Sequence, residues 1–284
     1  MFEVERFRSV VKGYSLHIGL NSVDPNHYDG WSGPLIACEA DANSMRKICQ
    51  GRGFQPKVLL TAQATRTTVL DHLSDLATNM AAGDTLIVSY SGHGGQLPDI
   101  NGDEDDGLDE TWCLFDGQLL DDELYWAWSK FQAGVRIAVF SDSCHSGTVI
   151  KQLALSQNVF SRSVDALDPS DGYRIMPPEI QYRTYEVNRD FYDELLQKPV
   201  PPPSPGCSVL LISGCQDNQL SRDGAFNGKF TGALISTWAN GKFKGTYAEF
   251  TKAIRERLPS TQSPNYLPAG AANPEFTNGE VFLV

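Results

Sequence analysis

Short apolar or β-branched runs alternate along this 284-residue chain with longer stretches whose apolar residues recur at helical spacing. Such alternation is typical of βαβ units, in which parallel strands form one sheet and helices cover it. It predicts one compact α/β domain with a mainly parallel sheet. The expected strands are Tyr14–Leu20, Pro56–Leu60, Thr85–Ser91, Arg136–Ser141, Ser208–Ser213 and Glu280–Leu283. The expected helices are Glu39–Gln50, Thr67–Met80, Asp121–Phe131, Lys229–Ala239 and Tyr247–Arg257.

Composition restricts the class of protein and its partners. Hydrophobic residues make up 41% and charged residues 20% of the chain, as in ordinary soluble globular proteins. A formal net charge of −12 disfavours nucleic acid and anionic membranes as partners and favours a cationic substrate segment. The N-terminal sequence lacks the apolar core of a signal peptide, and no stretch has the length of a membrane span. Six scattered cysteines without CxxC pairs suggest neither zinc nor disulfides, so we expect a cytoplasmic protein.

The segment Leu155–Gly206 interrupts the strand and helix rhythm. It has weak periodicity and ends in PVPPPSPG, which favours extended polyproline geometry over packed structure. We interpret it as a linker or loop between a larger part of the domain, residues 1–154, and a smaller part, residues 207–284. The loops Asn21–Pro34 and Gly94–Glu110 each follow an expected strand and are rich in turn-forming residues.

Two expected strands end in reactive residues. The run TLIVSYSGHGG leads to His93, and RIAVFSDSCHSG leads to Cys144. Because functional groups collect beyond the carboxyl ends of parallel strands, we expect these two side chains to meet at one edge of the sheet. An imidazole beside a thiol gives the reactive thiolate, so Cys144 is the candidate nucleophile and His93 its base. The backbone N–H groups of Gly94 and Cys144 are candidate oxyanion-hole donors.

Other cysteines and histidines fit structural roles better. An apolar-flanked cysteine is more often a small core residue than a nucleophile. This interpretation applies to Cys49, Cys113, Cys207 and Cys215, and core, surface or loop positions are expected for His17, His27 and His72. His145 competes with His93 as the base because it follows Cys144 directly, but adjacent side chains usually point apart.

Several ordered motifs resemble one family. These are SGHGGQ, NGDEDDGLDE, LLDDEL, SDSCHSG and ISGCQDNQLS, and the cysteine follows the histidine by 51 positions. From about Tyr14 to the C-terminus, the chain resembles caspase-like cysteine peptidases, in particular the metacaspases and bacterial orthocaspases. The resemblance implies a caspase-hemoglobinase three-layer α/β/α sandwich whose large-subunit-like and small-subunit-like regions are joined by a cleavable linker. It also implies a monomer.

A substrate pocket is expected beside the dyad. Asp142 and Ser91 lie two positions before Cys144 and His93, so each would share the active-site side of its strand end. The resemblance adds Cys38 and Asp41 as pocket residues and Asp217 as a weaker candidate. Asp41 also fits a plain first-turn helix carboxylate. Carboxylates in the pocket favour a cation, so we expect cleavage of protein or peptide substrates after Arg or Lys, and none after Asp.

Basic residues in and near the linker are candidates for self-cleavage, because mobile backbone is what a protease cleft accepts. They are Lys151, Arg162, Arg174, Arg183, Arg189 and Lys198. Two alternative functions remain at this point. One is a non-catalytic caspase-fold interaction module, and the other is a legumain-like ligase, which would share the acyl-enzyme with a hydrolase.

Calcium is the cofactor that the resemblance raises. The acidic run Asp99–Glu110 is not expected to form an EF-hand, because Glu104 stands where the sharp turn needs Gly. The calcium ligands of metacaspases would correspond here to Asp121, Asp122, Asp109 and an Asp seven residues after the catalytic Cys. That last position is Lys151, whose ammonium would repel a divalent cation. We therefore expect no required cofactor.

Overall fold

The computed structural model describes residues 11–98, 108–143, 173–197, 204–214, 223–224 and 226–284. Its strands are β1 (Gly13–Gly19), β2 (Gln55–Leu60), β3 (Thr85–Ser91), β4 (Gly94–Pro98), β5 (Leu108–Leu114), β6 (Gly117–Leu120), β7 (Arg136–Asp142), β8 (Ser208–Ser213) and β9 (Asn265–Gly270). Its α-helices are α1 (Cys38–Gly51), α2 (Arg66–Asn79), α3 (Asp121–Ser129), α6 (Pro178–Val187), α7 (Arg189–Leu196), α8 (Lys229–Trp238), α9 (Tyr247–Arg255) and α10 (Pro274–Thr277).

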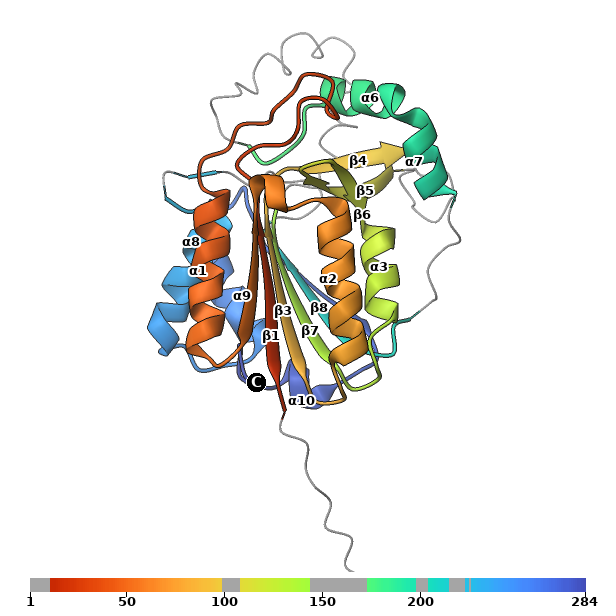
Figure 1. The fold of residues 1–284 in the computed structure, drawn as a ribbon. Helices are drawn as coiled ribbons and strands as arrows, with labels where there is room; N and C mark the ends of the chain where they lie inside the picture. The colour runs from red at the N-terminus through yellow and green to blue at the C-terminus, as the bar shows by residue number, and fades with distance from the viewer. Residues whose placement is uncertain (1–10, 99–107, 144–172, 198–203, 215–222, 225) are drawn as a thin grey trace, which may run out of the picture.

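A six-stranded sheet forms the centre of the domain, in the order β2-β1-β3-β7-β8-β9. All neighbouring pairs are parallel except β8 with β9, which is antiparallel. Helices α1, α8 and α9 cover one face, and α2 and α3 cover the other (Figure 1). This arrangement is the expected three-layer α/β/α sandwich.

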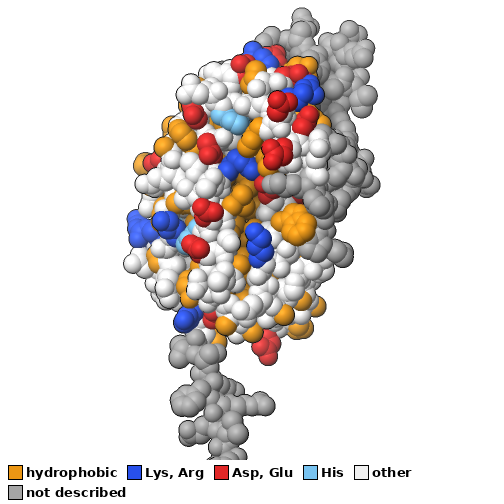
Figure 2. All heavy atoms as spheres, turned by 45° about the vertical axis from the view of Figure 1, so that its right-hand side comes forward, with side chains coloured by type: hydrophobic (Ala, Val, Ile, Leu, Met, Phe, Trp, Pro, Cys, Tyr) orange, Lys and Arg blue, Asp and Glu red, His pale blue; other side chains and the backbone are white. Residues whose placement is uncertain are grey.

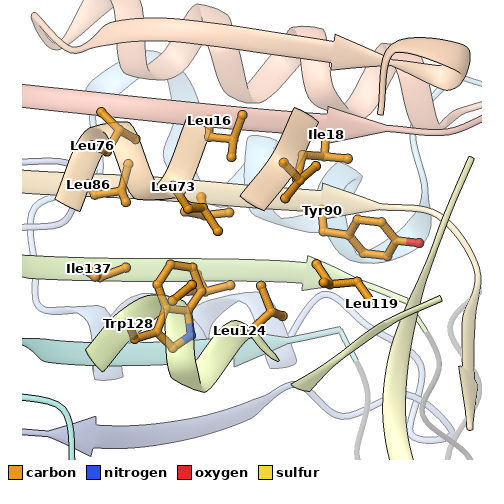
Figure 3. Packing of buried hydrophobic residues seen from close by; sticks show 14 of the residues in the cluster. Leu16, Ile18, Leu73, Leu76, Leu86, Tyr90, Leu119, Leu124, Trp128 and Ile137 are labelled. Atoms are coloured by element: carbon orange, nitrogen blue, oxygen red, sulfur yellow. The ribbon is translucent and has the colours of Figure 1, made fainter. Parts of the chain in front are cut away.

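The sheet is buried on both faces because its central strands are apolar throughout. Leu86 and Ile137 belong to the core under α2 and α3, whereas Ile87 and Ala138 belong to the core under α1, α8 and α9. Neighbouring residues in a strand point to opposite faces, so a continuous apolar run supplies both cores. Figure 3 shows Leu73 and Leu76 of α2 packing toward Leu86.

Helix boundaries follow local signals. Thr65 precedes α2, and its side chain accepts a hydrogen bond from the Thr68 backbone N–H. Thr246 and Glu249 form a reciprocal capping box at the start of α9. Both helices begin within one residue of the expected position, and five of the six expected strands are present.

The expected strand at Glu280–Leu283 is wrong. Val281 and Phe282 are fully buried, but they belong to the core under α8 and α9 without forming a strand. The sixth strand is instead β9, whose sequence NYLPAG contains Pro268 and is half-exposed. An edge strand needs neither an apolar run nor every backbone donor, so its sequence gives little signal.

The linker prediction is wrong for residues 178–196. Helices α6 and α7 occupy this stretch, and α7 buries Tyr192 and Leu196 against Leu97 and Leu120. Leu97 and Leu120 come from β4 and β6 of a separate antiparallel sheet, in the order β4-β5-β6. This sheet was also not expected from the sequence. Both helices are short, with ten and eight residues, and helices of this length depend on tertiary packing more than on local sequence signals.

Within the described ranges, no helix is both long enough and apolar enough to span a bilayer. On the face seen in Figure 2, acidic and basic side chains lie interspersed among neutral ones.

Candidate active site

The site lies where β3 and β7 end together. In the parallel register, Ser91 pairs with Asp142, the last residue of each strand. Gly19 at the end of β1 pairs with Ser91 on the other side. His93 follows β3 by two residues, and the sheet therefore brings it to the same edge as Asp142, as expected for the carboxyl ends of parallel strands.

His93 is held in one orientation by the loop before α1. Its side chain is buried, and Nε2 donates a hydrogen bond of 3.1 Å to the carbonyl oxygen of Gly33. The ring of Trp31 lies against it, with 4.8 Å between ring centroids. Gly33 has a φ of +51°, and a Cβ there would lie 2.7 Å from Trp31 and 3.0 Å from the imidazole. Only glycine therefore allows this loop to approach His93 so closely.

The hydrogen bond to Gly33 decides which nitrogen of His93 is basic. A carbonyl can only accept, so Nε2 carries the proton and Nδ1 keeps its lone pair. Nδ1 makes no hydrogen bond to any residue that the structure describes. Burial lowers the pKa of His93 to about 4, although the Gly33 carbonyl and the nearby backbone of Ile175 act in the opposite direction. The neutral ring can therefore accept a proton through Nδ1.

A buried arginine fills the predicted substrate pocket. The side chain of Arg174 is 0% exposed, and its guanidinium contacts three carboxylates. Its Nη2 lies 2.7 Å from Asp41 Oδ2 and 2.9 Å from Asp223 Oδ1, and its Nη1 lies 2.9 Å from Asp142 Oδ2. Nη1 also donates to Ser91 Oγ at 2.7 Å and to the Asp142 carbonyl at 3.1 Å.

The charge balance of this pocket requires a cation. Burial opposes the charged form of Arg174, but Asp142, Asp41 and Asp223 outweigh it and hold the pKa of the guanidinium well above its ordinary value. Burial raises the pKa of Asp41, and Arg174 opposes that shift. Without a bound cation, three carboxylates would be buried together with no counter-charge, a costly arrangement.

Two of these carboxylates are held by the segment that begins α8. Asp142 Oδ2 accepts from the backbone N–H of Thr231 at 3.0 Å and from its hydroxyl at 2.8 Å. Asp41 accepts from Asn227 Nδ2 at 2.8 Å and from the backbone N–H of Gly228 at 3.0 Å. A Cβ at Gly228 would lie 2.4 Å from the guanidinium of Arg174, so this position leaves room only for glycine.

The structure brings several predicted residues together. Ser91 links two of them, because its hydroxyl donates to Asp41 at 2.7 Å while it accepts from Arg174. Cys38, at the start of α1, is fully buried beside this group, and burial raises the pKa of its thiol to about 12. The backbone N–H of Gly94, the predicted oxyanion donor, donates to the Arg174 carbonyl oxygen at 3.0 Å.

Five predicted site residues lie outside the described part of the chain: Cys144, Asp217, Lys151, Arg162 and Lys198. Three candidates for self-cleavage do not lie in mobile backbone, and that expectation is wrong for them. Arg174 is fully buried in a segment that is hydrogen-bonded to Gly94. Arg183 is within α6 and pairs with Asp29 at 3.1 Å, and Arg189 begins α7. Helical backbone is already hydrogen-bonded internally and does not fit an extended cleft.

Sequence reasoning missed several contributors to the site. They are Trp31, Gly33, Asp223, Asn227 and Thr231. Four of them contribute a backbone group, a supporting hydrogen bond or a ring contact. Many loop residues can make such contributions, so the sequence does not single these four out. Asp223 is the exception, since an acidic residue in the loop-like stretch SRDGAFNGK could have been considered as a pocket carboxylate.

The candidate calcium ligands form an acidic neighbourhood at the start of α3. Burial raises the pKa of Asp121 well above its ordinary value, and Glu110, Asp109 and Asp122 add to the shift. Among the residues that the structure describes, no group of three or more His, Cys, Asp or Glu side chains is arranged to hold a metal ion. Because Lys151 is outside that set, the role assigned to its ammonium stays a prediction.

Comparison with known proteins gives the family. The family model described as Caspase domain matches residues 23–280. Metacaspase-1 of Schizosaccharomyces pombe is 31% identical over 285 residues, covering 89% of this chain and 65% of that protein. Metacaspase-1A of Aspergillus niger is 29% identical over 293 residues, covering 90% of this chain and 70% of that protein.

Solved structures agree with this result. A crystal structure of a Geobacter sulfurreducens protein superposes with a TM-score of 0.86 at 52% identity, covering 96% of this chain and 99% of that one. Caspase-1 of Spodoptera frugiperda has a TM-score of 0.55 at 10% identity, covering 96% and 90%, which shows a shared fold. Because the family model spans most of its length and metacaspases are its relatives, the chain belongs to the caspase-domain family of cysteine peptidases, among the metacaspase-like members.

Proposed function

We propose that this protein is a cysteine endopeptidase that cleaves after Arg or Lys, with Cys144 as nucleophile and His93 as base, and that it processes itself. The observation that carries the specificity is the guanidinium of Arg174, fully buried among Asp41, Asp142 and Asp223. A site that desolvates a guanidinium and surrounds it with carboxylates favours a cationic side chain over a neutral or acidic one.

The catalytic cycle follows from the orientation of His93. Nδ1 takes the proton of the Cys144 thiol, and the thiolate attacks the carbonyl carbon that follows the basic side chain. The backbone N–H groups of Gly94 and Cys144 stabilise the oxyanion. The imidazolium then gives its proton to the departing amine, which leaves an acyl-enzyme. A water molecule, deprotonated by the same imidazole, hydrolyses the thioester and restores the thiol.

Arginine and lysine should differ in rate, since they use the pocket differently. A guanidinium makes several charge-assisted hydrogen bonds in a fixed plane, as Arg174 does with Asp41, Asp142 and Ser91. A lysine ammonium has three donors on a flexible stem and can satisfy fewer of these acceptors at once. We therefore expect cleavage after Arg to be faster than after Lys. An aspartate would add a fourth carboxylate to the pocket and should not be accepted.

The test is hydrolysis of matched peptides that differ only in Arg, Lys or Asp before the cut, with the bond located by mass spectrometry. Cys144→Ala should abolish cleavage, and His93→Ala should lower it by orders of magnitude. His145→Ala is the matched control and should cost much less. Efficient cutting after Asp, or turnover by purified Cys144→Ala, would refute the proposal.

Partners and cofactors follow from the same proposal. The substrates are proteins or peptides that present a basic residue in extended backbone. The net charge of −12 is the reason to expect neither nucleic acid nor anionic membranes as partners. No metal takes part in the chemical steps, which need only the thiol, the imidazole and backbone donors. A monomeric state, a cytoplasmic location and independence of calcium remain predictions.

A further inference from the structure

Arg174 is bound through its main chain as well as its side chain. Its carbonyl oxygen accepts from the Gly94 backbone N–H at 3.0 Å. Two residues later, the backbone N–H of Met176 donates to the Gly94 carbonyl at 2.8 Å, so that Gly94 and Ile175 form a parallel β-bridge. The segment therefore runs in extended conformation alongside the glycines that follow His93.

The residues after Arg174 are anchored by apolar contacts. Met176 is fully buried in a small cluster with Val23, Tyr28 and Cys113. Helix α6 begins directly afterwards at Pro178. The backbone on this side of the Arg174 carbonyl is thus fixed relative to the site.

We infer that residues 173–176 are an internal substrate of the protein's own cleft, and that the Arg174–Ile175 peptide bond is its self-cleavage site. This inference rests on the proposed endopeptidase function and adds its regulation. Arg174 occupies the specificity pocket, its carbonyl meets the predicted oxyanion donor, and the backbone of Ile175 forms a bridge to Gly94, the residue that follows His93. An intact chain is therefore latent, because no other basic side chain can enter a filled pocket.

The self-cleavage step balances without any further reactant except water. The Cys144 sulfur forms a bond to the Arg174 carbonyl carbon, and the oxyanion rests on the Gly94 N–H. The C–N bond to Ile175 breaks as the imidazolium of His93 protonates that nitrogen. Water then replaces sulfur on the Arg174 carbon. The products are a carboxylate at Arg174 and a free amine at Ile175.

Geometry separates Arg174 from two of the other candidates. Arg183 and Arg189 lie on helices, with side chains about half exposed and paired to surface carboxylates. Cleavage at either residue would require its helix to unfold and the unfolded segment to move into the pocket. Arg174 is already extended and in place. Lys151, Arg162 and Lys198 lie outside the described residues, so the experiment must distinguish cuts at these positions by fragment mass.

The occupied pocket determines how much the KM for a peptide substrate is raised in the uncut protein. A tethered ligand acts at an effective concentration in the millimolar range, and peptide binds only the fraction of molecules in which the pocket is empty. The uncut protein should therefore hydrolyse an Arg peptide at a KM raised by on the order of 10-fold or more over the emptied site. Its kcat should change little, because the emptied site is chemically the same in both states.

The first experiment follows self-cleavage and peptide hydrolysis in the same sample of the full chain. We expect two fragments, residues 1–174 and 175–284, the second beginning with Ile-Met-Pro-Pro, and an Arg-peptidase rate that rises as they form. Arg174→Ala should not produce these fragments. It should nevertheless hydrolyse the Arg peptide at its full rate from the start, without the delay that self-cleavage causes in the unmodified protein. Arg183→Ala removes an equivalent charge from the surface pair with Asp29 and should behave like the unmodified protein.

A second variant keeps the inference testable if Arg174→Ala folds poorly. Arg174→Lys retains the buried charge, and it should still cut at position 174 but more slowly. Fluorescent p-aminobenzamidine, a guanidinium-like cation, should bind Cys144→Ala, Arg174→Ala far more tightly than Cys144→Ala alone, since only the former has an open pocket. Circular dichroism of each variant establishes that it is folded.

Three outcomes would overturn the inference: full Arg-peptidase activity in chain that stays intact, a first cut at another residue, or equal p-aminobenzamidine affinity with and without Arg174. Failure of the proposed function looks different. In that case Arg174→Ala, folded and with its pocket open, would hydrolyse no Arg peptide at all.

Discussion

Replacing Asp142 by Asn should separate the recognition of charge from the rest of catalysis. In the structure one carboxylate oxygen of Asp142 accepts from Thr231 twice and lies 2.9 Å from the guanidinium of Arg174. An Asn side chain can keep the hydrogen bonds from Thr231 through its oxygen. The same oxygen would still face the guanidinium, but the negative charge that pairs with the cation would be lost.

The magnitude follows from what the substrate loses. A hydrogen bond to a charged group contributes about 1.5–3 kcal/mol, and removing one partner of a buried ion pair costs about 3–5 kcal/mol. Asp41 and Asp223 still face the cation, so we take about 3 kcal/mol. This corresponds to a loss of about two orders of magnitude in kcat/KM for an Arg peptide.

The assay compares four rates: the unmodified protein and Asp142→Asn, each with an Arg peptide and with the same peptide containing citrulline, the neutral isostere of Arg. All four use protein that has already cut itself, so that the pocket is open. We expect Asp142→Asn to lower Arg hydrolysis about 100-fold and citrulline hydrolysis less than about 10-fold, a coupling of more than 1 kcal/mol. Glu280→Gln, which removes a carboxylate from the surface pair with Arg52, is the control and should leave both rates unchanged. Equal losses for Arg and citrulline would refute the role given to the Asp142 charge.

Three further predictions concern stability and metal. Burial lowers the pKa of His17 to about 3, so the unfolded state binds more protons than the folded state below pH 6.5. Lowering the pH from 7 to 5 should therefore reduce the free energy of unfolding by about 2 kcal/mol, measured in urea. The variant His17→Gln should not show this loss. An equal pH dependence in both proteins would contradict this. Glu123→Gln should destabilise the chain by about 3 kcal/mol because it leaves the Arg66 guanidinium buried without its ion pair, again measured in urea, and a loss under 1 kcal/mol would contradict it. Peptide hydrolysis should survive excess EDTA and become calcium-sensitive only in Lys151→Asp, whereas strict calcium dependence of the unmodified enzyme would disprove the ammonium-for-calcium idea.

The sequence predicted those parts of the molecule that depend on local patterns. Continuous apolar runs located the central strands, and the strand ends located His93 and Asp142. Asp41 was predicted as a pocket residue only through the family resemblance. From the sequence alone, a carboxylate in the first turn of α1 is equally well explained by its favourable interaction with the helix dipole. The carbonyl of Gly33 that orients His93 could not be predicted, because any loop residue offers a carbonyl and only the fold brings one to the imidazole.

Arg174 shows the limit of such reasoning most clearly. It was one of six basic residues that seemed equivalent as cleavage sites, and neither charge nor neighbouring sequence distinguished it. The distinction is tertiary: three carboxylates from separate parts of the chain converge on this guanidinium. Helices α6 and α7 were missed for a related reason, because their burial depends on the small sheet.

The pairing of β7 with β8 gives self-cleavage an unusual outcome. A cut after Arg174 would place β7 in one fragment and β8 in the other, yet the two strands are hydrogen-bonded from Arg136 with Ser208 to Ser141 with Ser213. Each fragment alone would expose the unpaired edge of a buried, apolar strand. The cut protein would therefore persist as a two-chain complex that neither dilution nor gel filtration separates, and only denaturation would reveal the break. Once unfolded, the two pieces would have to find each other again, so refolding would become a second-order process that the intact chain avoids.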